Sequence, residues 1–140
     1  MSKLVAHRYG KARVRVLKIL REGDVHRLKD IEAMVLLQGD FETSYTSGDN
    51  SKVVATDSIK NTINILAKEK LGDEIERFAI VLGEHFLKRY VQVHAVEVEI
   101  VEKNWQRMDV AGKPHPHSFV ARSGACTFTR VVISRMQMFL

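Results

Sequence analysis

Apolar and polar residues alternate along the first forty residues, with the two-residue period of a β-strand. Within the segment 12–20, valines alternate with basic residues, so two faces are predicted: Val14 and Val16 on one, and Lys11, Arg13 and Arg15 on the other. A second alternating segment spans residues 25–41, and Glu22-Gly23-Asp24 between the two is typical of a turn. The pattern therefore predicts a long antiparallel hairpin.

The middle of the chain has the spacing of two helices. Thr56-Asp57-Ser58 are all favourable N-cap residues, and apolar residues follow at helical spacing to about Lys70. The residues 71–73 interrupt this pattern, and a second apolar stripe predicts a helix over 75–90. The preceding segment 38–54 is polar, rich in turn residues and longer than most connections, so we expect a loop that lines a site.

Alternation returns in the last third of the chain. Val96, Val98 and Ile100 predict one face of a strand over 91–105, but the valines before them are in the other phase, which indicates a bulge near Ala95. After a turn at residues 111–114, a fourth strand is predicted from Ser118 to about Met138. One side of this strand is expected to carry Thr127, Thr129, Val131 and Ile133.

The order ββααββ predicts a single α+β domain over residues 1–140, with an antiparallel sheet that carries both helices on one face. The composition, 45% hydrophobic and 28% charged, is sufficient for a hydrophobic core. We expect an oligomer, because the strands carry more apolar residues than two helices would cover. These residues are Val14, Val16, Val96, Val98, Val131 and Ile133.

Charge and composition narrow the class of protein. The sequence has no apolar segment long enough to cross a membrane and no clear secretion signal, so we expect a cytoplasmic protein, or a peroxisomal one in a eukaryote. The net charge is +5, and basic residues are concentrated in residues 1–30, which favours an anionic ligand near that end. Nucleic acid is the weakest alternative, because Tyr9 is the only aromatic residue there that could stack on a base.

Two positions have the chemistry of an anion-binding or proton-transfer site. Lys11 follows Tyr9-Gly10, where glycine permits a close backbone approach, and a lysine becomes a useful base where cationic neighbours lower its pKa. Thr56-Asp57-Ser58 begin a helix, where free N–H groups bind anions. For each position an ordinary alternative stays open, namely a solvated basic strand edge for Lys11 and simple helix capping for Thr56.

The remaining candidates favour no metal site. His115-Pro116-His117 places two imidazoles at the spacing of a metal pair, but none of the other histidines is evident in the sequence as a third ligand, so a turn or interface role is preferred. Cys126 is the only cysteine, which excludes an intrachain disulfide, and it is expected to be a buried structural thiol.

Several distinctive stretches resemble one known family: Tyr9-Gly10-Lys11, Gly48-Asp49-Asn50-Ser51, the ten residues 53–62, Glu84-His85-Phe86, the segment 101–107 and the segment 112–119. Together they resemble urate oxidase (uricase) over nearly the whole chain, fading after about Ser123. The ten-residue run around Thr56 is highly specific. The resemblance implies the tunnelling fold (T-fold), in which domains assemble edge to edge into a barrel.

The resemblance also implies a function and a site. Family enzymes oxidise urate with O2 and water to 5-hydroxyisourate and hydrogen peroxide, without a metal or an organic cofactor. Lys11 and Thr56 are then the expected catalytic pair that moves protons. Thr56 and Asp57 are expected to bind the substrate at the helix start.

The length departs from the family pattern, because a uricase has two tandem domains and this chain resembles the N-terminal one only. The residues that hold the urate ring from the second domain have no counterpart here. The expected partners are therefore urate, O2, and either other copies of this chain or a second-domain chain, with no nucleic acid and no membrane. A non-catalytic purine-binding or assembly module is the alternative to half of a urate oxidase.

Overall fold

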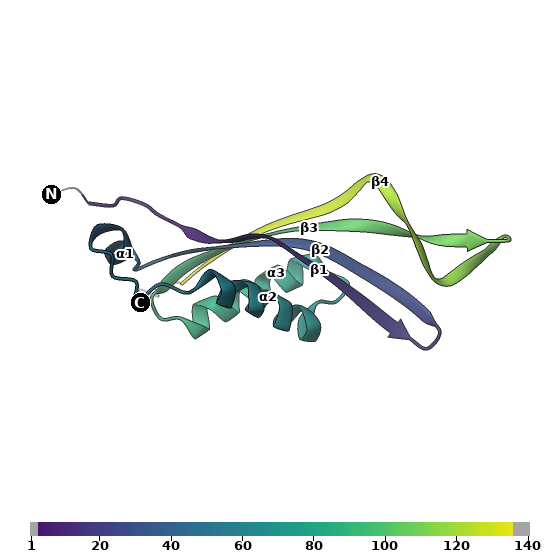
Figure 1. The fold of residues 1–140 in the computed structure, drawn as a ribbon, viewed down its shortest axis with the longest axis horizontal. Coiled ribbons are helices and arrows are strands. Elements are labelled where there is room, and N and C mark those ends of the chain that lie inside the picture. The colour runs from purple at the N-terminus through teal and green to yellow at the C-terminus, as the bar shows by residue number, and fades with distance from the viewer. Residues whose placement is uncertain (1–2, 136–140) are drawn as a thin grey trace, which may run out of the picture.

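A computed structural model describes residues 3–135 of the chain, which form one sheet and three helices (Figure 1). In chain order the elements are β1 (Tyr9–Glu22), β2 (Val25–Gly39), α1 (Glu42–Thr46), α2 (Thr56–Lys70), α3 (Ile75–Arg89), β3 (Val93–Val110) and β4 (Lys113–Ser134). The α+β class and the order of the four strands and the two long helices are as predicted. The additional helix α1 lies in the segment expected to be an irregular loop.

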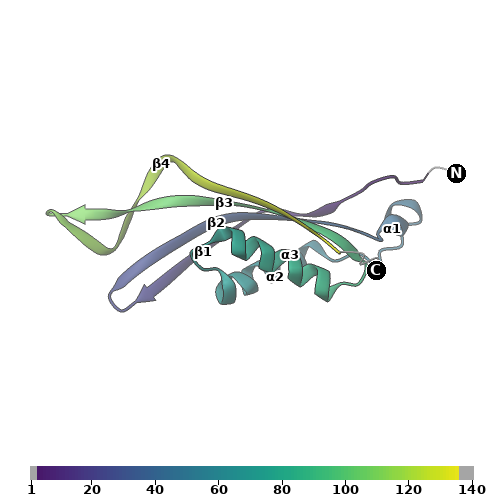
Figure 2. The ribbon, with the colours of Figure 1, turned by 180° about the vertical axis from the view of Figure 1, so that it is seen from behind.

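The sheet is fully antiparallel, with the strand order β1-β2-β3-β4. The predicted hairpin is confirmed, and Gly23, with φ of 63°, lies at its turn. Both long helices lie on one side of the sheet, as Figure 1 and the reverse view in Figure 2 show. The opposite side carries no helix in residues 3–135, and we call it the open face.

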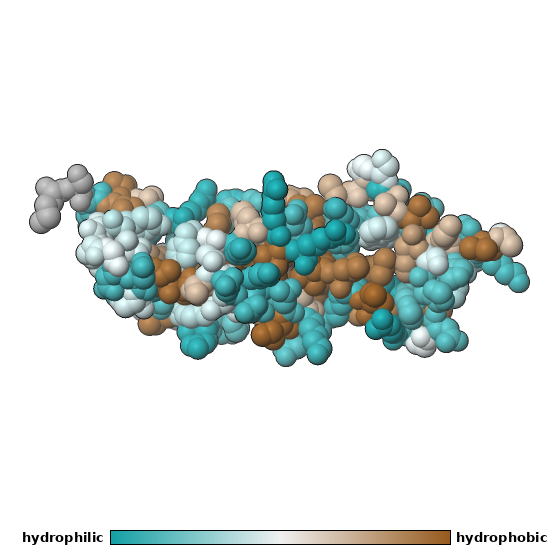
Figure 3. Space-filling view, in the orientation of Figure 1, coloured by the Kyte–Doolittle hydropathy of each residue, from teal (hydrophilic) through white to brown (hydrophobic). Residues whose placement is uncertain are grey.

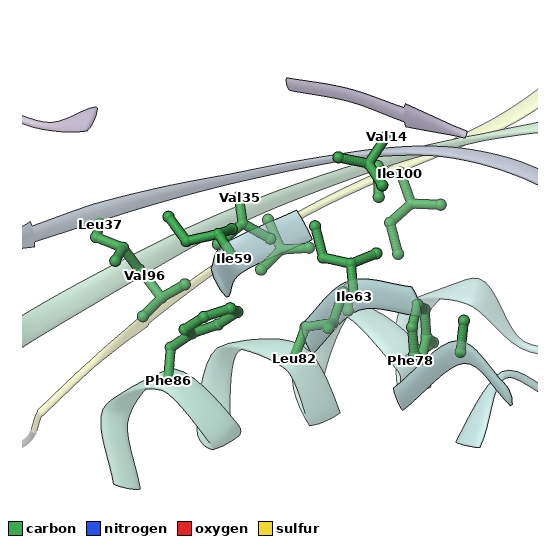
Figure 4. Packing of buried hydrophobic residues seen from close by; sticks show 14 of the residues in the cluster. Val14, Val35, Leu37, Ile59, Ile63, Phe78, Leu82, Phe86, Val96 and Ile100 are labelled. Carbon is green, nitrogen blue, oxygen red and sulfur yellow. The ribbon is translucent and has the colours of Figure 1, made fainter. Parts of the chain in front are cut away.

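The core fills the space between the sheet and the two long helices (Figure 4). Side chains from α2, such as Ile59 and Ile63, meet those from α3, such as Phe78 and Phe86, and all four are at most 1% exposed. The strands contribute the alternate residues that face the helices: Val14, Ile31, Ala33, Val35, Leu37, Val96, Val98 and Ile100. The two-residue and helical periods in the sequence therefore identified the core correctly.

We expected an oligomer because six apolar residues on the strands would be left uncovered by the helices. That reason is wrong for these six residues. The helices bury Val14, Val96 and Val98 completely or nearly so, and Val16, Val131 and Ile133 pack partly buried against the same core. The exposed apolar side chains on the strands belong to other positions, which include Leu17, Phe128 and Val132, each more than half exposed. In Figure 3 apolar side chains lie among hydrophilic ones on the visible surface.

The last two strands agree with the predictions in part. A register irregularity between Gln38 and Gly39, opposite residues 93–95, confirms the bulge near Ala95. The turn consists of Ala111 and Gly112, both with positive φ, so β4 begins at Lys113, earlier than expected, and His115 and His117 lie in the strand rather than in the turn. The predicted strand end at Met138 lies outside the described residues.

Two further expectations concern single features. Cys126 is exposed on β4, so the prediction of a buried thiol is wrong. None of the described helices is long and apolar enough to cross a membrane.

Candidate functional site

Lys11 lies on the helix-covered side of the sheet, not beside the two arginines. A bulge between Lys11 and Val14 adds one residue to β1, and Arg13 within it takes the left-handed conformation with φ of 55°. Lys11 consequently pairs with Val35, a fully buried residue that faces the helices. The predicted face was therefore wrong, because the extra residue moves Lys11 to the side of Val14.

Gly10 explains why the strands can approach so closely at this point. A Cβ atom at Gly10 would lie 1.8 Å from the carbonyl oxygen of Val35 and 2.9 Å from the Cα of Leu36. Any other residue would force β1 away from β2 immediately before Lys11. The close approach expected from Tyr9-Gly10-Lys11 is confirmed.

The start of α2 differs in detail from the expected cap. Ala55 is the N-cap residue, and no side chain forms a capping hydrogen bond there, so the alternative that Thr56 simply caps the helix is wrong. Thr56 and Asp57 are both exposed in the first turn. The first N–H groups of a helix have no partner within it, and Asp57 lies at the positive end of the helix dipole. The helix start therefore presents amide donors to the solvent.

Contacts at the two ends of α2 align this helix with β1. The Tyr9 hydroxyl donates to the carbonyl of Val54 at 2.9 Å and accepts from the Val54 N–H at 2.7 Å, two residues before Thr56. At the other end, Lys18 Nζ donates to the carbonyls of Ala67, Lys68 and Leu71 at 2.8–3.1 Å.

The strand and the helix thus run in the same direction. Tyr9, Lys11 and Lys18 all pair with residues of β2 on the helix side. Because Lys11 follows Tyr9 by two positions, it advances about 7 Å along β1. Lys11 therefore lies toward the end of the β1–α2 pair at which Tyr9 contacts Val54, and Thr56 and Asp57 begin α2 at that same end.

Arg15 forms a separate cluster with Asp30 and Trp105 on the open face. Arg15 donates two hydrogen bonds to the buried Asp30 carboxylate, at 2.9 and 3.2 Å, and Trp105 Nε1 donates a third at 3.0 Å. Burial opposes ionisation of Asp30, but these hydrogen bonds and the Arg15 charge outweigh it and lower the pKa of the carboxyl. This cluster fixes β1, β2 and β3 together and leaves Arg15 unavailable to Lys11.

The basic residues near the N-terminus are largely engaged within the fold. Arg8 pairs with Glu97 at 2.9 Å, and Arg27 pairs with Glu22 and Asp73 at 3.0 and 2.9 Å. Lys29 is buried and pairs with Glu102 at 2.6 Å. These partners neutralise much of the charge that favoured an anionic ligand near the N-terminal end.

The histidine motif has a neighbour that the sequence did not reveal. The rings of His115 and His117 have centroids 4.5 Å apart, and His26 of β2 lies 5.7 Å from His117. Arg107 fixes the surrounding backbone by donating to the carbonyls of His26, His115 and Pro116. Within residues 3–135 no group of three or more His, Cys, Asp or Glu side chains is arranged to hold a metal ion.

Comparisons with known proteins agree with one another. The family model described as Uricase matches residues 7–132. The uricase of Aspergillus flavus is 50% identical over 125 residues, which cover 88% of this chain and 41% of that protein. The uricase of Dictyostelium discoideum is 44% identical over 122 residues, covering 85% of this chain and 42% of that protein.

A solved structure extends the likeness to the fold. The uricase from Arthrobacter globiformis matches with a TM-score of 0.89 and 32% identity, covering 96% of this chain and 45% of that one. The T-fold expected from the sequence is thereby confirmed for the described residues. The chain spans about 40% of the length of the curated relatives it matches. With the family model, the relatives and the structure in agreement, this chain belongs to the uricase family.

Proposed function

We propose that this chain supplies one half of a urate-oxidising site. In the proposed reaction urate, O2 and water give 5-hydroxyisourate and hydrogen peroxide, so urate loses two electrons and O2 gains them. Lys11 and Thr56 move protons, and Thr56 and Asp57 hold the substrate. The observation that carries the proposal is the bulge in β1, because it directs Lys11 to the side on which α2 begins.

The geometry supports a substrate of this charge. Urate is an anion at neutral pH, and the exposed first turn of α2 offers backbone N–H donors at the positive end of the helix dipole. Thr56 adds a hydroxyl that forms no cap hydrogen bond. In this proposal Lys11 accepts a proton through the Thr56 hydroxyl, as a general base does. These groups need neither a metal nor an organic cofactor.

The other half of the site must come from outside residues 3–135 of this copy of the chain. Thr56 and Asp57 are exposed, so the helix start offers donors from one side only. A flat anionic ring held from one side loses the positioning on which such a reaction depends. We infer that a second-domain chain, or further copies of this chain, covers the site when the domains assemble into a barrel.

The first test uses the chain alone. Urate consumption is followed by its ultraviolet absorbance and peroxide release by a coupled peroxidase, while light scattering gives the mass in solution. We expect an oligomer with little or no turnover, whereas rapid turnover would refute the view that half of the site is missing. Urate binding without peroxide, even when the remaining domain is supplied, would favour the alternative of a purine-binding or assembly module.

A further inference from the structure

The Tyr9 hydroxyl joins the strand that carries Lys11 to the segment that leads into Thr56. It satisfies both backbone groups of Val54, as donor to the carbonyl and as acceptor from the N–H. Val54 is only 4% exposed, so neither group has ready access to solvent as a substitute. The contact spans 45 positions of sequence and ends two residues before the helix begins.

Two other contacts hold the Tyr9 ring in place. The ring packs edge to face on Phe41, with centroids 4.9 Å apart, and Phe41 is itself 1% exposed. The following residue, Gly10, lies against the backbone of β2 with no room for a side chain. The packing of the ring on Phe41 and the close approach at Gly10 therefore hold the Tyr9 side chain in place on β1. Its two hydrogen bonds hold Val54 against it.

We propose that Tyr9 is a positioning residue, whose hydroxyl sets the separation between Lys11 and Thr56 by fixing Val54 to β1. The proposal rests on the function proposed above. Lys11 follows Tyr9 by two positions on the same face, and Thr56 follows Val54 by two positions. The Tyr9 hydroxyl therefore connects the strand that carries Lys11 to the segment that leads into Thr56, so a movement of this contact would change the distance between the two residues.

If Tyr9 only stabilised the fold, its loss would have the same effect as the loss of any other contact between α2 and β1. Lys18, at the opposite end of α2, provides the control for this alternative. Lys18 fastens the end of α2 to β1 through three carbonyls, but it lies seven positions beyond Lys11 on β1. Loss of Lys18 should loosen the helix without displacing its first turn. Tyr9→Phe keeps the ring and its contact with Phe41 while it removes both hydrogen bonds.

The experiment compares Tyr9→Phe and Lys18→Gln in the full chain by NMR. The first measurement needs no ligand: nuclear Overhauser contacts between the Lys11 side chain and the Thr56 methyl group report their separation. We expect these contacts in the unmodified chain and in Lys18→Gln, and their loss in Tyr9→Phe. Their absence from the unmodified chain, their persistence in Tyr9→Phe, or their equal loss in both variants would overturn the proposal.

The second measurement adds urate under nitrogen, so that no turnover occurs, and follows the amide signals of Thr56 and Asp57. We expect Tyr9→Phe to weaken urate binding at least fivefold and Lys18→Gln to change it less than twofold, even where both variants lose similar thermal stability. Equal urate affinity in the two variants would overturn the proposal that the Tyr9 hydroxyl positions the urate-binding residues. A Lys11–Thr56 contact that depends on Tyr9, without any response to urate even when the remaining domain is supplied, would instead refute the proposed function.

Discussion

Replacing Gly10 with alanine should disrupt the fold at the point where the proposed site is built. The added Cβ would lie 1.8 Å from the Val35 carbonyl oxygen, about 1.2 Å inside the closest approach that real Cβ atoms show. The obstacle is backbone of the central strand β2 and not a flexible side chain, so β1 itself must move. Overpacking of this kind costs about 1–3 kcal/mol, and a backbone clash favours the upper end of that range.

The matched control is Gly72→Ala. Gly72 lies in the connection between α2 and α3, its backbone does not require positive φ, and a Cβ there would meet no atom within 4 Å. We expect that substitution to change stability by less than about 0.5 kcal/mol, or to raise it slightly by restricting the unfolded chain.

The free energy of unfolding from urea titrations compares the two variants with the unmodified chain. We also expect Gly10→Ala to shift the amide signals of Lys11 and Val35, and Gly72→Ala to leave them unchanged. If the free energy of unfolding of the Gly10→Ala variant lay within about 0.5 kcal/mol of that of the unmodified chain, the close approach of β1 and β2 would be refuted. The placement of Lys11 depends on that approach.

Three further predictions follow from individual contacts. Thr56→Ala should cost less than about 0.5 kcal/mol in urea unfolding, because the Thr56 side chain forms no cap hydrogen bond, and a loss near 1 kcal/mol would restore the capping role. The lowered pKa of Asp30 means that its contribution is present above the ordinary carboxyl pKa and is lost as the pH falls through the folded value. The free energy of unfolding should therefore fall less steeply between about pH 5 and 2 in Asp30→Asn than in the unmodified chain. An equally steep fall in both would contradict this role of Asp30. Burial raises the pKa of Tyr9, so its contribution is complete below about pH 10 and is lost as the pH rises through the folded value. The difference in unfolding free energy between the unmodified chain and Tyr9→Phe should therefore shrink above about pH 10, and a constant difference would contradict this view.

The regular parts of the fold could be read from the sequence because periodic burial leaves a periodic pattern. Val96, Val98 and Ile100 are fully buried, as their alternation predicted, and the apolar stripe of α3 faces the sheet. The short helix α1 could not be found in this way, since five residues are too few for a helical period to appear.

The residues of the candidate site stay a prediction, and their local geometry could not be read from the sequence. A strict two-residue period predicted Lys11 on the same face as Arg13. Nothing in the sequence marks the bulge in β1, in which Arg13 has a positive φ. The Thr56-Asp57-Ser58 run predicted the helix start to within one residue, yet the N-cap is Ala55. The bond from Tyr9 to Val54 links distant parts of the chain, and only the packing of α2 on β1 reveals it. The residues alone marked Lys11 and the Thr56-Asp57-Ser58 run as candidates with ordinary alternatives, and their roles in catalysis and substrate binding came from the family resemblance.

The central claim, that Lys11 serves urate oxidation, is tested most directly in a complete enzyme. Residues 7–132 of this chain can replace the matching segment of the Aspergillus flavus uricase, to which the chain is 50% identical. Peroxide release from urate is then measured for this chimaera and for its Lys11→Met and Arg13→Met variants, which remove one charge each on opposite faces of β1. We predict an active chimaera, a loss of about 10²-fold or more in Lys11→Met with the fold intact, and a nearly unchanged rate in Arg13→Met. A Lys11→Met chimaera that releases peroxide as fast as its parent would contradict the account.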